Sequence, residues 1–91
     1  MSVKFKIAET EHFRKQINNL NFTKLYFKIE NIVYPQLRAN PFFGPNIKKL
    51  KGEFEGYYRF RIGNYRLFYK IDKQKVIVFI LEIAHRKDAY S

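Results

Sequence analysis

The sequence predicts an α+β fold: one domain over residues 1–91, in which an N-terminal strand and a helical hairpin pack on a twisted antiparallel sheet. First, the chain has 91 residues, 46% of them hydrophobic, which suffices for one core and leaves little room for a second. Second, apolar residues recur at helical spacing between about residues 10 and 37. Third, most of the remaining chain consists of alternating or continuous apolar runs separated by turn residues, which is typical of strands.

Residues 3–7 alternate between apolar and charged side chains and predict a first strand, which we expect at an edge of the sheet. Thr10 suits a helix N-cap, and Glu11 in the first turn complements the helix dipole. The helix is expected to run to about Leu20, because apolar residues recur at helical spacing at Phe13, Ile17 and Leu20.

A second helix is expected to begin near Phe22 or Thr23. Its apolar stripe consists of Leu25, Ile29, Ile32, Val33 and Leu37. Pro35 falls inside this pattern, and proline removes a helix hydrogen bond and clashes with the preceding turn. Because the stripe continues to Leu37, we favour a kinked helix over one that ends at Tyr34. The two helices would form a hairpin on one face of the sheet.

Turn-forming residues dominate the middle of the chain. Residues 40–46 contain Pro, Gly and Asn and predict a loop, whose Phe42 and Phe43 we expect to fill the edge of the core. Residues 47–51 are a short, basic strand candidate, and residues 52–56 form a turn region.

Two alternating runs, residues 57–62 and 65–69, predict a β-hairpin around Gly63 and Asn64. A two-residue loop with Gly in first position suits a type II′ turn and fixes the register of the two strands. One face then carries apolar or aromatic residues: Tyr58, Phe60, Ile62, Tyr65, Leu67 and Tyr69. The opposite face carries Arg59, Arg61 and Arg66, with Phe68 among them. In this register Arg61 faces Arg66, and such a like-charge pair destabilises a sheet unless an anion lies between its members.

Residues 76–83 are apolar on both faces and predict a central strand that is covered on both sides. Pairing Ile71 with Val76 would place Val78 and Ile80 on the core face and Leu81 beside Arg66. The apolar residues expected on the arginine face, namely Phe68, Ile77, Phe79 and Leu81, would then form a patch for a partner to cover.

The net charge of the chain indicates which classes of partner it binds. It has 18 Lys and Arg residues against 8 Asp and Glu residues, a net charge of +10, which points to nucleic acid, an acidic membrane surface or an acidic protein. The longest apolar run is too short to span a bilayer, so no membrane partner is expected. With no cysteines and scattered acids, we expect no metal site, no cofactor and a location compatible with the cytoplasm.

The remaining candidate chemistry is cationic. Arginines bind phosphate bidentately and stabilise negative charge that develops on it, and a His or Tyr side chain can transfer protons. The candidate residues are Arg59, Arg61 and Arg66 on the hairpin and His85, Arg86 and Tyr90 in the tail. Together they supply the parts for metal-free RNA cleavage. The alternative is a solvated outer face, and basic patches also bind polyanions without chemistry.

Three segments carry a resemblance to a known family: residues 50–52, Gly56-Tyr57-Tyr58-Arg59-Phe60-Arg61-Ile62-Gly63-Asn64-Tyr65-Arg66-Leu67-Phe68-Tyr69, and His85-Arg86-Lys87-Asp88-Ala89-Tyr90. They resemble the RelE/ParE superfamily of toxins from bacterial and archaeal type II toxin–antitoxin systems. The resemblance implies the RelE-like fold and, for RelE-like members, a ribosome-dependent endoribonuclease that cuts mRNA in the A site. Such members use the 2′-OH as nucleophile and need no metal.

The resemblance also implies roles for single residues. Arg59, Arg61, Arg66 and Arg86 match the catalytic cations, and Tyr90 matches a tyrosine that serves as a base or a stacking platform. The first two positions are lysines in the best-known member, so His85 is a candidate for a proton-transfer role. RNA contacts are expected from Lys49, Lys51 and Phe68.

The expected partners are a cognate acidic antitoxin, which wraps the toxin, together with the ribosome and mRNA. ParE-like members share the fold but inhibit DNA gyrase and are not nucleases, which leaves gyrase inhibition as an alternative. A third alternative is a non-catalytic relic that only binds RNA.

Overall fold

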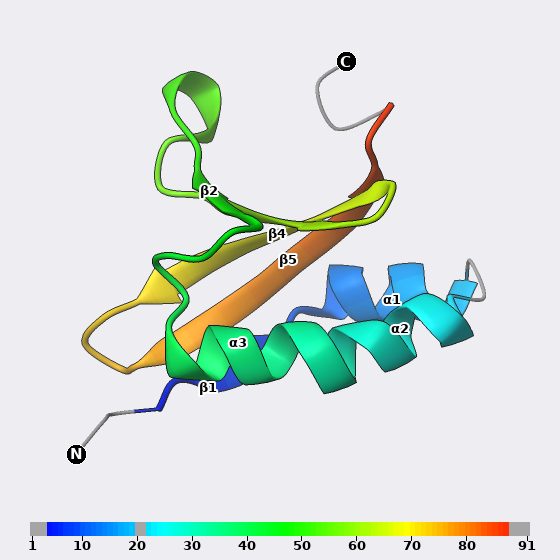
Figure 1. Ribbon diagram of the computed structural model, residues 1–91, viewed down its shortest axis with the longest axis horizontal. Helices are drawn as coiled ribbons and strands as arrows, with labels where there is room; N and C mark the ends of the chain where they lie inside the picture. The colour runs from blue at the N-terminus through cyan, green and yellow to red at the C-terminus, as the bar shows by residue number, and fades with distance from the viewer. Residues whose placement is uncertain (1–3, 20–21, 88–91) are drawn as a thin grey trace.

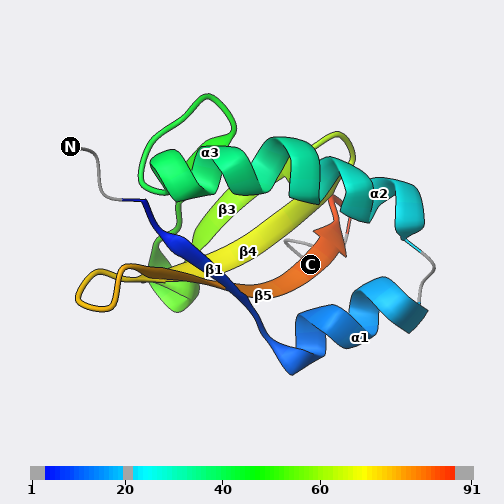
Figure 2. The ribbon, with the colours of Figure 1, turned by 90° about the horizontal axis from the view of Figure 1, so that it is seen from below.

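The computed structural model describes residues 4–19 and 22–87, in which the strands form one sheet and the α-helices lie on one of its faces (Figures 1 and 2). The sheet has five strands in the order β1-β5-β4-β3-β2. The strands are β1 (Lys6–Glu9), β2 (Ile47–Lys49), β3 (Tyr58–Ile62), β4 (Tyr65–Asp72) and β5 (Ile77–His85). The predicted α+β class is confirmed, with β1 parallel to β5 and the other neighbours antiparallel. None of the described helices is long and apolar enough to cross a membrane.

The N-terminal strand lies at the sheet edge, as predicted, but begins later than the alternating pattern indicates. β1 pairs with β5 from Lys6 to Glu9, whereas the predicted strand covered residues 3–7. The reason is that the backbone N–H of Phe5 donates to the carbonyl of Arg38, 2.9 Å away, so residue 5 is bonded to the end of a helix. Residue 3 lies outside the described residues.

Helix α1 (Glu11–Asn19) begins after the predicted cap. The Thr10 hydroxyl accepts a hydrogen bond from the N–H of Phe13 and donates to the carbonyl of Ile80, at 3.2 and 2.8 Å. Further along the helix, the Gln16 amide both donates to the carbonyl of Ile83 and accepts from its N–H. Beyond the end of β1, side chains of α1 therefore satisfy the backbone at the edge of β5.

The second helical segment continues past Pro35, as the apolar stripe predicts. It comprises α2 (Thr23–Lys28), a π-helical turn η1 (Ile29–Val33) and α3 (Tyr34–Ala39). The π turn ends at Val33, two residues before Pro35, whose ring would clash with the carbonyl of Asn31 in an unbroken α-helix. The wider turn shifts the hydrogen-bond pattern where proline lacks its N–H, which lets one helical segment span residues 23–39.

The hairpin register is confirmed at each predicted pair, including Arg61 opposite Arg66 and Arg59 opposite Phe68. Gly63 has a φ of 54°, as the first loop residue of a type II′ turn requires. The predicted β4–β5 register is wrong, because Ile71 pairs with Val78 and not with Val76.

Two features account for that register error. Val76 has a φ of 58° and belongs to the turn, in a left-handed conformation that a β-branched residue rarely adopts. A bulge between Phe68 and Tyr69 then shifts the pairing once more, so that Arg66 lies opposite Ala84 and not beside Leu81.

The prediction that β5 is covered on both sides is also wrong, because the α-helices lie on one face of the sheet (Figure 2).

The core lies between the sheet and the helices. Its buried members are Phe13, Ile29, Val33, Tyr34, Leu37, Tyr58, Phe60, Leu67, Tyr69, Val78, Ile80 and Ile83. Phe42 packs against this cluster as predicted, whereas Phe43 is 79% exposed, so one of the two loop phenylalanines fills the core edge. The Tyr69 hydroxyl donates to the carbonyl of Pro41 at 2.7 Å and fastens the loop to the sheet.

Candidate functional site

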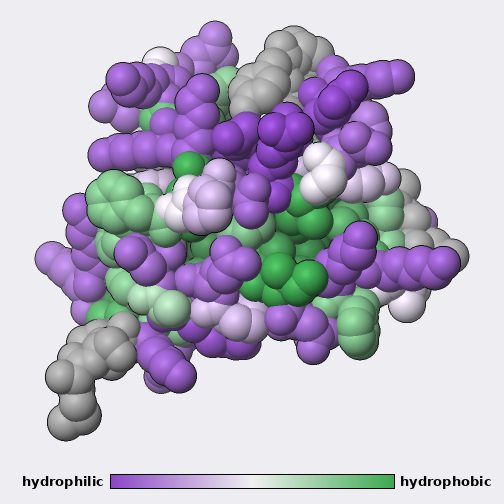
Figure 3. All heavy atoms as spheres, in the orientation of Figure 1, coloured by the Kyte–Doolittle hydropathy of each residue, from purple (hydrophilic) through white to green (hydrophobic). Residues whose placement is uncertain are grey.

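The face of the sheet that the helices leave open carries the predicted arginines. We call it the cationic face and define it by Lys48, Arg59, Arg61, Arg66 and Lys70, which the registers of β2, β3 and β4 direct to the same side. In Figure 1 the segment after β2 and the end of β5 both rise on this side of the sheet. Figure 3 shows hydrophilic side chains gathered over the same half of the molecule.

Arg66 is buried on this face without a full set of partners. Its side chain is 8% exposed, lies opposite Arg61, and donates from Nη1 to the carbonyl of Tyr65 at 3.3 Å. Within residues 4–19 and 22–87, two buried side-chain polar atoms have no hydrogen-bond partner, and both are guanidinium nitrogens: Nε of Arg59 and Nε of Arg66. A buried polar group without a partner costs about 1–3 kcal/mol, and the cost is larger for a charged group.

Among the described residues, no carboxylate forms an ion pair with these arginines. The ion pairs found in the described part of the chain join His12 to Glu82 at 3.9 Å and Lys15 to Glu11 at 3.4 Å. In the same residues, no group of three or more His, Cys, Asp or Glu side chains comes together. The cationic face therefore presents unpaired guanidinium groups that suit an anion with several acceptor oxygens.

Of the tail residues, Arg86 lies at the hairpin turn and His85 on the core side of the sheet. The backbone N–H of Arg86 donates to the carbonyl of Asn64 at 2.7 Å, which ties the end of β5 to the hairpin turn. His85 pairs with Tyr65, and their rings contact edge-to-face at a centroid distance of 5.3 Å. Its ring therefore lies on the Tyr65 side of the sheet, away from the arginines. Tyr90 lies outside the described residues.

The predicted RNA-contacting residues are also divided. Phe68 lies opposite Arg59 on the cationic face, but it is buried. Lys49 pairs with Tyr58, so the alternation of the strand directs it to the opposite face, and Lys48 takes the place beside Arg59. Lys51 follows β2, in the segment that leads to the 3₁₀ turn η2 (Gly52–Phe54).

The sequence reasoning missed Lys48 and Lys70, and it misplaced the exposed apolar residues. Phe68 is buried, and Ile77, Phe79 and Leu81 are half-buried, so the expected apolar patch is not there in that form. The large hydrophobic side chains that are exposed are Phe27, Ile32, Phe43 and Phe54. Phe54 and Phe43 lie in loops, where no periodic pattern marks a residue as exposed.

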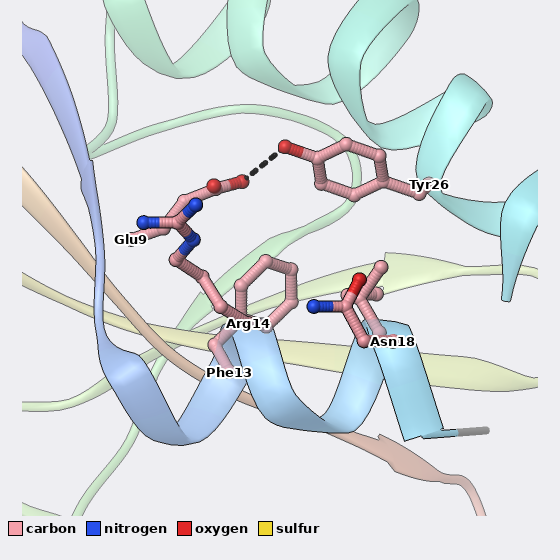
Figure 4. A pocket seen from close by; sticks show the side chains of 6 residues that line it. Glu9, Phe13, Arg14, Asn18 and Tyr26 are labelled. Carbon is pink, nitrogen blue, oxygen red and sulfur yellow. Dashed lines mark hydrogen bonds between the residues drawn. The ribbon is translucent and has the colours of Figure 1, made fainter. Parts of the chain in front are cut away.

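A cavity of about 210 Å³ lies on the helix side of the sheet between α1 and α2 (Figure 4). Glu9 of β1 points into it, and its Oε2 accepts hydrogen bonds from the hydroxyls of Tyr26 and Tyr34 at 2.7 and 2.6 Å. Burial raises the pKa of Tyr34 above its usual range, and the hydrogen bond to Glu9 raises it further. Figure 4 shows Arg14 of α1 reaching toward the same carboxylate. These contacts connect β1 to the long helical segment.

Comparison with known proteins identifies relatives of the chain. A family model described as "ParE toxin of type II toxin-antitoxin system, parDE" matches residues 8–90. A stretch of 43 residues is 44% identical to Toxin RelG of Mycobacterium tuberculosis and covers 47% of this chain and 49% of that protein. The match therefore spans about half the length of this curated relative.

Solved structures share the fold over nearly the whole chain. One is a chain of the toxin–antitoxin complex RelBE2 from Mycobacterium tuberculosis, with a TM-score of 0.74 and 26% identity over 97% of this chain and 98% of that one. Another is a chain of the YoeB–YefM complex from Staphylococcus aureus, with a TM-score of 0.69 and 22% identity over 90% of this chain and 97% of that one.

Proposed function

Because the chain belongs to the ParE toxin family of type II toxin–antitoxin systems, within the RelE/ParE superfamily, we propose that it is a toxin that cleaves mRNA on the ribosome. The reaction is attack of a ribose 2′-OH on the adjacent phosphate, without a metal or cofactor. Its substrate partners are the ribosome and mRNA, and its effect is to stop translation.

The observation that carries this proposal is the pair of buried guanidinium nitrogens without partners, Nε of Arg59 and Nε of Arg66. A fold retains such groups at a cost to its stability, and a phosphodiester would satisfy them with charge-assisted hydrogen bonds. Arg61 opposite Arg66 adds a further cation at the same place. The site is thus organised before an anion binds, which is the arrangement that stabilises charge developing in a transition state.

Each proposed role follows from the chemistry of the side chain. Arg59, Arg61, Arg66 and Arg86 hold the scissile phosphate and stabilise the additional negative charge of the pentacovalent phosphorane. The bond from the 2′ oxygen to phosphorus forms, the bond to the 5′ oxygen breaks, and the products are a 2′,3′-cyclic phosphate and a 5′-OH.

The 2′-OH loses a proton and the departing 5′ oxygen gains one. Arginine rarely transfers protons, because its pKa is too high. We assign these transfers to Tyr90, with His85 as the second candidate. His85 would have to turn away from Tyr65 to reach the phosphate, since its ring now lies against Tyr65.

An acidic antitoxin is the proposed protein partner. The net charge of +10 favours a segment rich in carboxylates, and the similar RelBE2 chain was solved in a toxin–antitoxin complex. Such a segment would satisfy the arginines of the cationic face in place of RNA and so prevent cleavage.

The test is induction of the protein in cells, followed by mapping of mRNA ends. We expect translation to stop and mRNA to be cut within codons. Arg66→Ala and Arg86→Ala should relieve toxicity while the protein still folds, whereas Lys28→Ala, an exposed cation on α2, should remain toxic. If the two arginine variants are as toxic as the wild type, the site is wrongly assigned.

Gyrase inhibition is the second candidate, and the ParE description of the matching family model favours it. It predicts filamentous cells and blocked DNA supercoiling, with mRNA left intact. Supercoiling assays with purified gyrase, performed beside the mRNA mapping, separate the two functions.

A further inference from the structure

An aromatic and cationic cluster occupies the end of the cationic face that lies away from the hairpin turn. Tyr57 directly precedes β3 and continues the row that Arg59 and Arg61 form on that strand. The ammonium of Lys70 lies over the Tyr57 ring, 4.6 Å from its centroid. Lys70 is next to Tyr69, which pairs with Tyr58, so both the register and the contact place Tyr57 on the cationic face.

Phe54 extends this cluster into solvent. Its ring contacts Tyr57 in a T-shaped arrangement, with 6.4 Å between centroids and 61° between planes. The N–H of Tyr57 also donates to the carbonyl of Phe54 at 3.0 Å, so the short turn holds the two residues together. Gly52 and Gly56 flank the turn with φ values of 69° and 91°, which other residues rarely adopt. Phe54 is nevertheless 45% exposed.

A basic hollow lies beside the exposed ring. Lys48, Lys49 and Lys51 line a hollow of about 390 Å³ together with Phe54. Burial of a phenylalanine ring stabilises a fold, yet Phe54 keeps nearly half of its surface in water. An apolar ring held among cations matches a ligand that offers flat π faces and negative charges in alternation. Single-stranded nucleic acid has this chemistry, because bases stack on aromatic side chains while phosphates bind cations.

We propose that Phe54 and Tyr57 form a stacking platform for a nucleobase of the RNA, next to the phosphate bound by the arginines. This inference rests on the proposed function. Successive residues on one face of a strand are about 7 Å apart, so Tyr57 lies about 7 Å from Arg59 and about 13 Å from Arg61 along β3. A base held on the platform therefore sets which phosphate reaches Arg61 and Arg66. Lys48 and Lys70 supply phosphate contacts beside it.

The test measures binding of a short single-stranded 2′-O-methyl RNA that cannot be cleaved and that contains 2-aminopurine. In the wild type we expect binding by fluorescence anisotropy and quenching of 2-aminopurine as it stacks. Phe54→Ala should weaken binding about 5- to 150-fold, the range measured for single base–aromatic stacks. It should also abolish the quenching. The salt dependence of RNA binding should stay unchanged, because the substitution removes no charge. Phe54→Tyr should behave as the wild type.

Phe43→Ala is the matched control, since Phe43 is an exposed loop phenylalanine outside the cluster. Equal RNA affinity and equal quenching in Phe54→Ala and the wild type would overturn the platform. If Phe54→Ala binds RNA as the wild type does and also cleaves mRNA, while Arg66→Ala does not cleave it, the platform is wrong and the nuclease function stands. If the wild type neither binds the RNA nor cleaves mRNA, both proposals fail. Loss of antitoxin affinity in Phe54→Ala with RNA binding intact would assign the cluster to the protein partner instead.

Discussion

The free protein should become more stable when a guanidinium is removed from the cationic face. Arg66 is 8% exposed, its Nε has no partner, and Arg61 lies directly opposite. Arg66→Met keeps an unbranched apolar stem but removes the charge, relieving a penalty of about 1–3 kcal/mol and a like-charge pair of about 0.2–1 kcal/mol. Against this stands the lost hydrogen bond to the Tyr65 carbonyl, of about 1.5–3 kcal/mol for a charged donor. The midpoints of these ranges leave a net gain of about 0.4 kcal/mol.

Urea unfolding and calorimetry measure this effect. A gain of about 0.4 kcal/mol corresponds to a rise in Tm of roughly 2–3 °C for a domain of this size. A double-mutant cycle with Arg61→Met should give a repulsive coupling of about 0.2–1 kcal/mol between the two arginines. Inorganic phosphate at 100 times its Kd should stabilise the wild type by about 2.7 kcal/mol, and Arg66→Met by much less.

Lys28→Met serves as the control, because it removes an exposed charge on α2, outside the cationic face. Destabilisation of Arg66→Met by more than about 1 kcal/mol would contradict this prediction, since it would mean that the guanidinium is well satisfied in the free protein. A coupling of zero between Arg61 and Arg66 would refute the repulsion between them.

Two further predictions concern stability. Burial raises the pKa of Tyr26, Tyr34 and Tyr69, so stability should be full below pH 10, the unfolded pKa of tyrosine, and fall as the pH rises above it. Absorbance at 295 nm should then show these tyrosines ionising only as the protein unfolds, and ionisation of all tyrosines at pH 10 in the folded state would contradict this. Val76→Gly should raise the free energy of unfolding by up to about 1 kcal/mol in urea, because glycine tolerates the φ of 58°; a loss of stability would show that its side-chain packing outweighs the strain.

Local signals made one part of the sheet predictable. The two-residue loop at Gly63 and Asn64 leaves the strands no freedom of register, and the structure confirms Arg61 opposite Arg66. The turn between β4 and β5 contains more residues. Valine rarely adopts the left-handed conformation that Val76 has there, so the sequence does not indicate it. The bulge at Phe68 adds a further shift, so alternation alone predicted the correct face for Val78 but not its partner.

Non-local geometry decided which candidate site residues lie together. β2 has three residues, too few for its pattern to specify which lysine faces Arg59, and the structure places Lys48 there. His85 precedes Arg86 in a tail whose residues all looked available to the arginines. β5 extends through His85, however, so strand alternation directs its ring to Tyr65 and away from Arg66.

The alternation of β4 joins the stability of this fold to the chemistry proposed for it. Leu67 and Tyr69 are fully buried in the core, while Arg66 and Phe68 lie between and beside them on the opposite face. Slipping the register by one residue would move the arginine into the core, so burial of Leu67 and Tyr69 is what holds the guanidinium groups at their spacing. Burial on the core face thus offsets the cost of the unpaired cations on the cationic face. Substitutions along β4 should therefore differ by the face of the sheet that they change: those on the core face lower stability and activity together, whereas those at Arg66 lower activity without lowering stability.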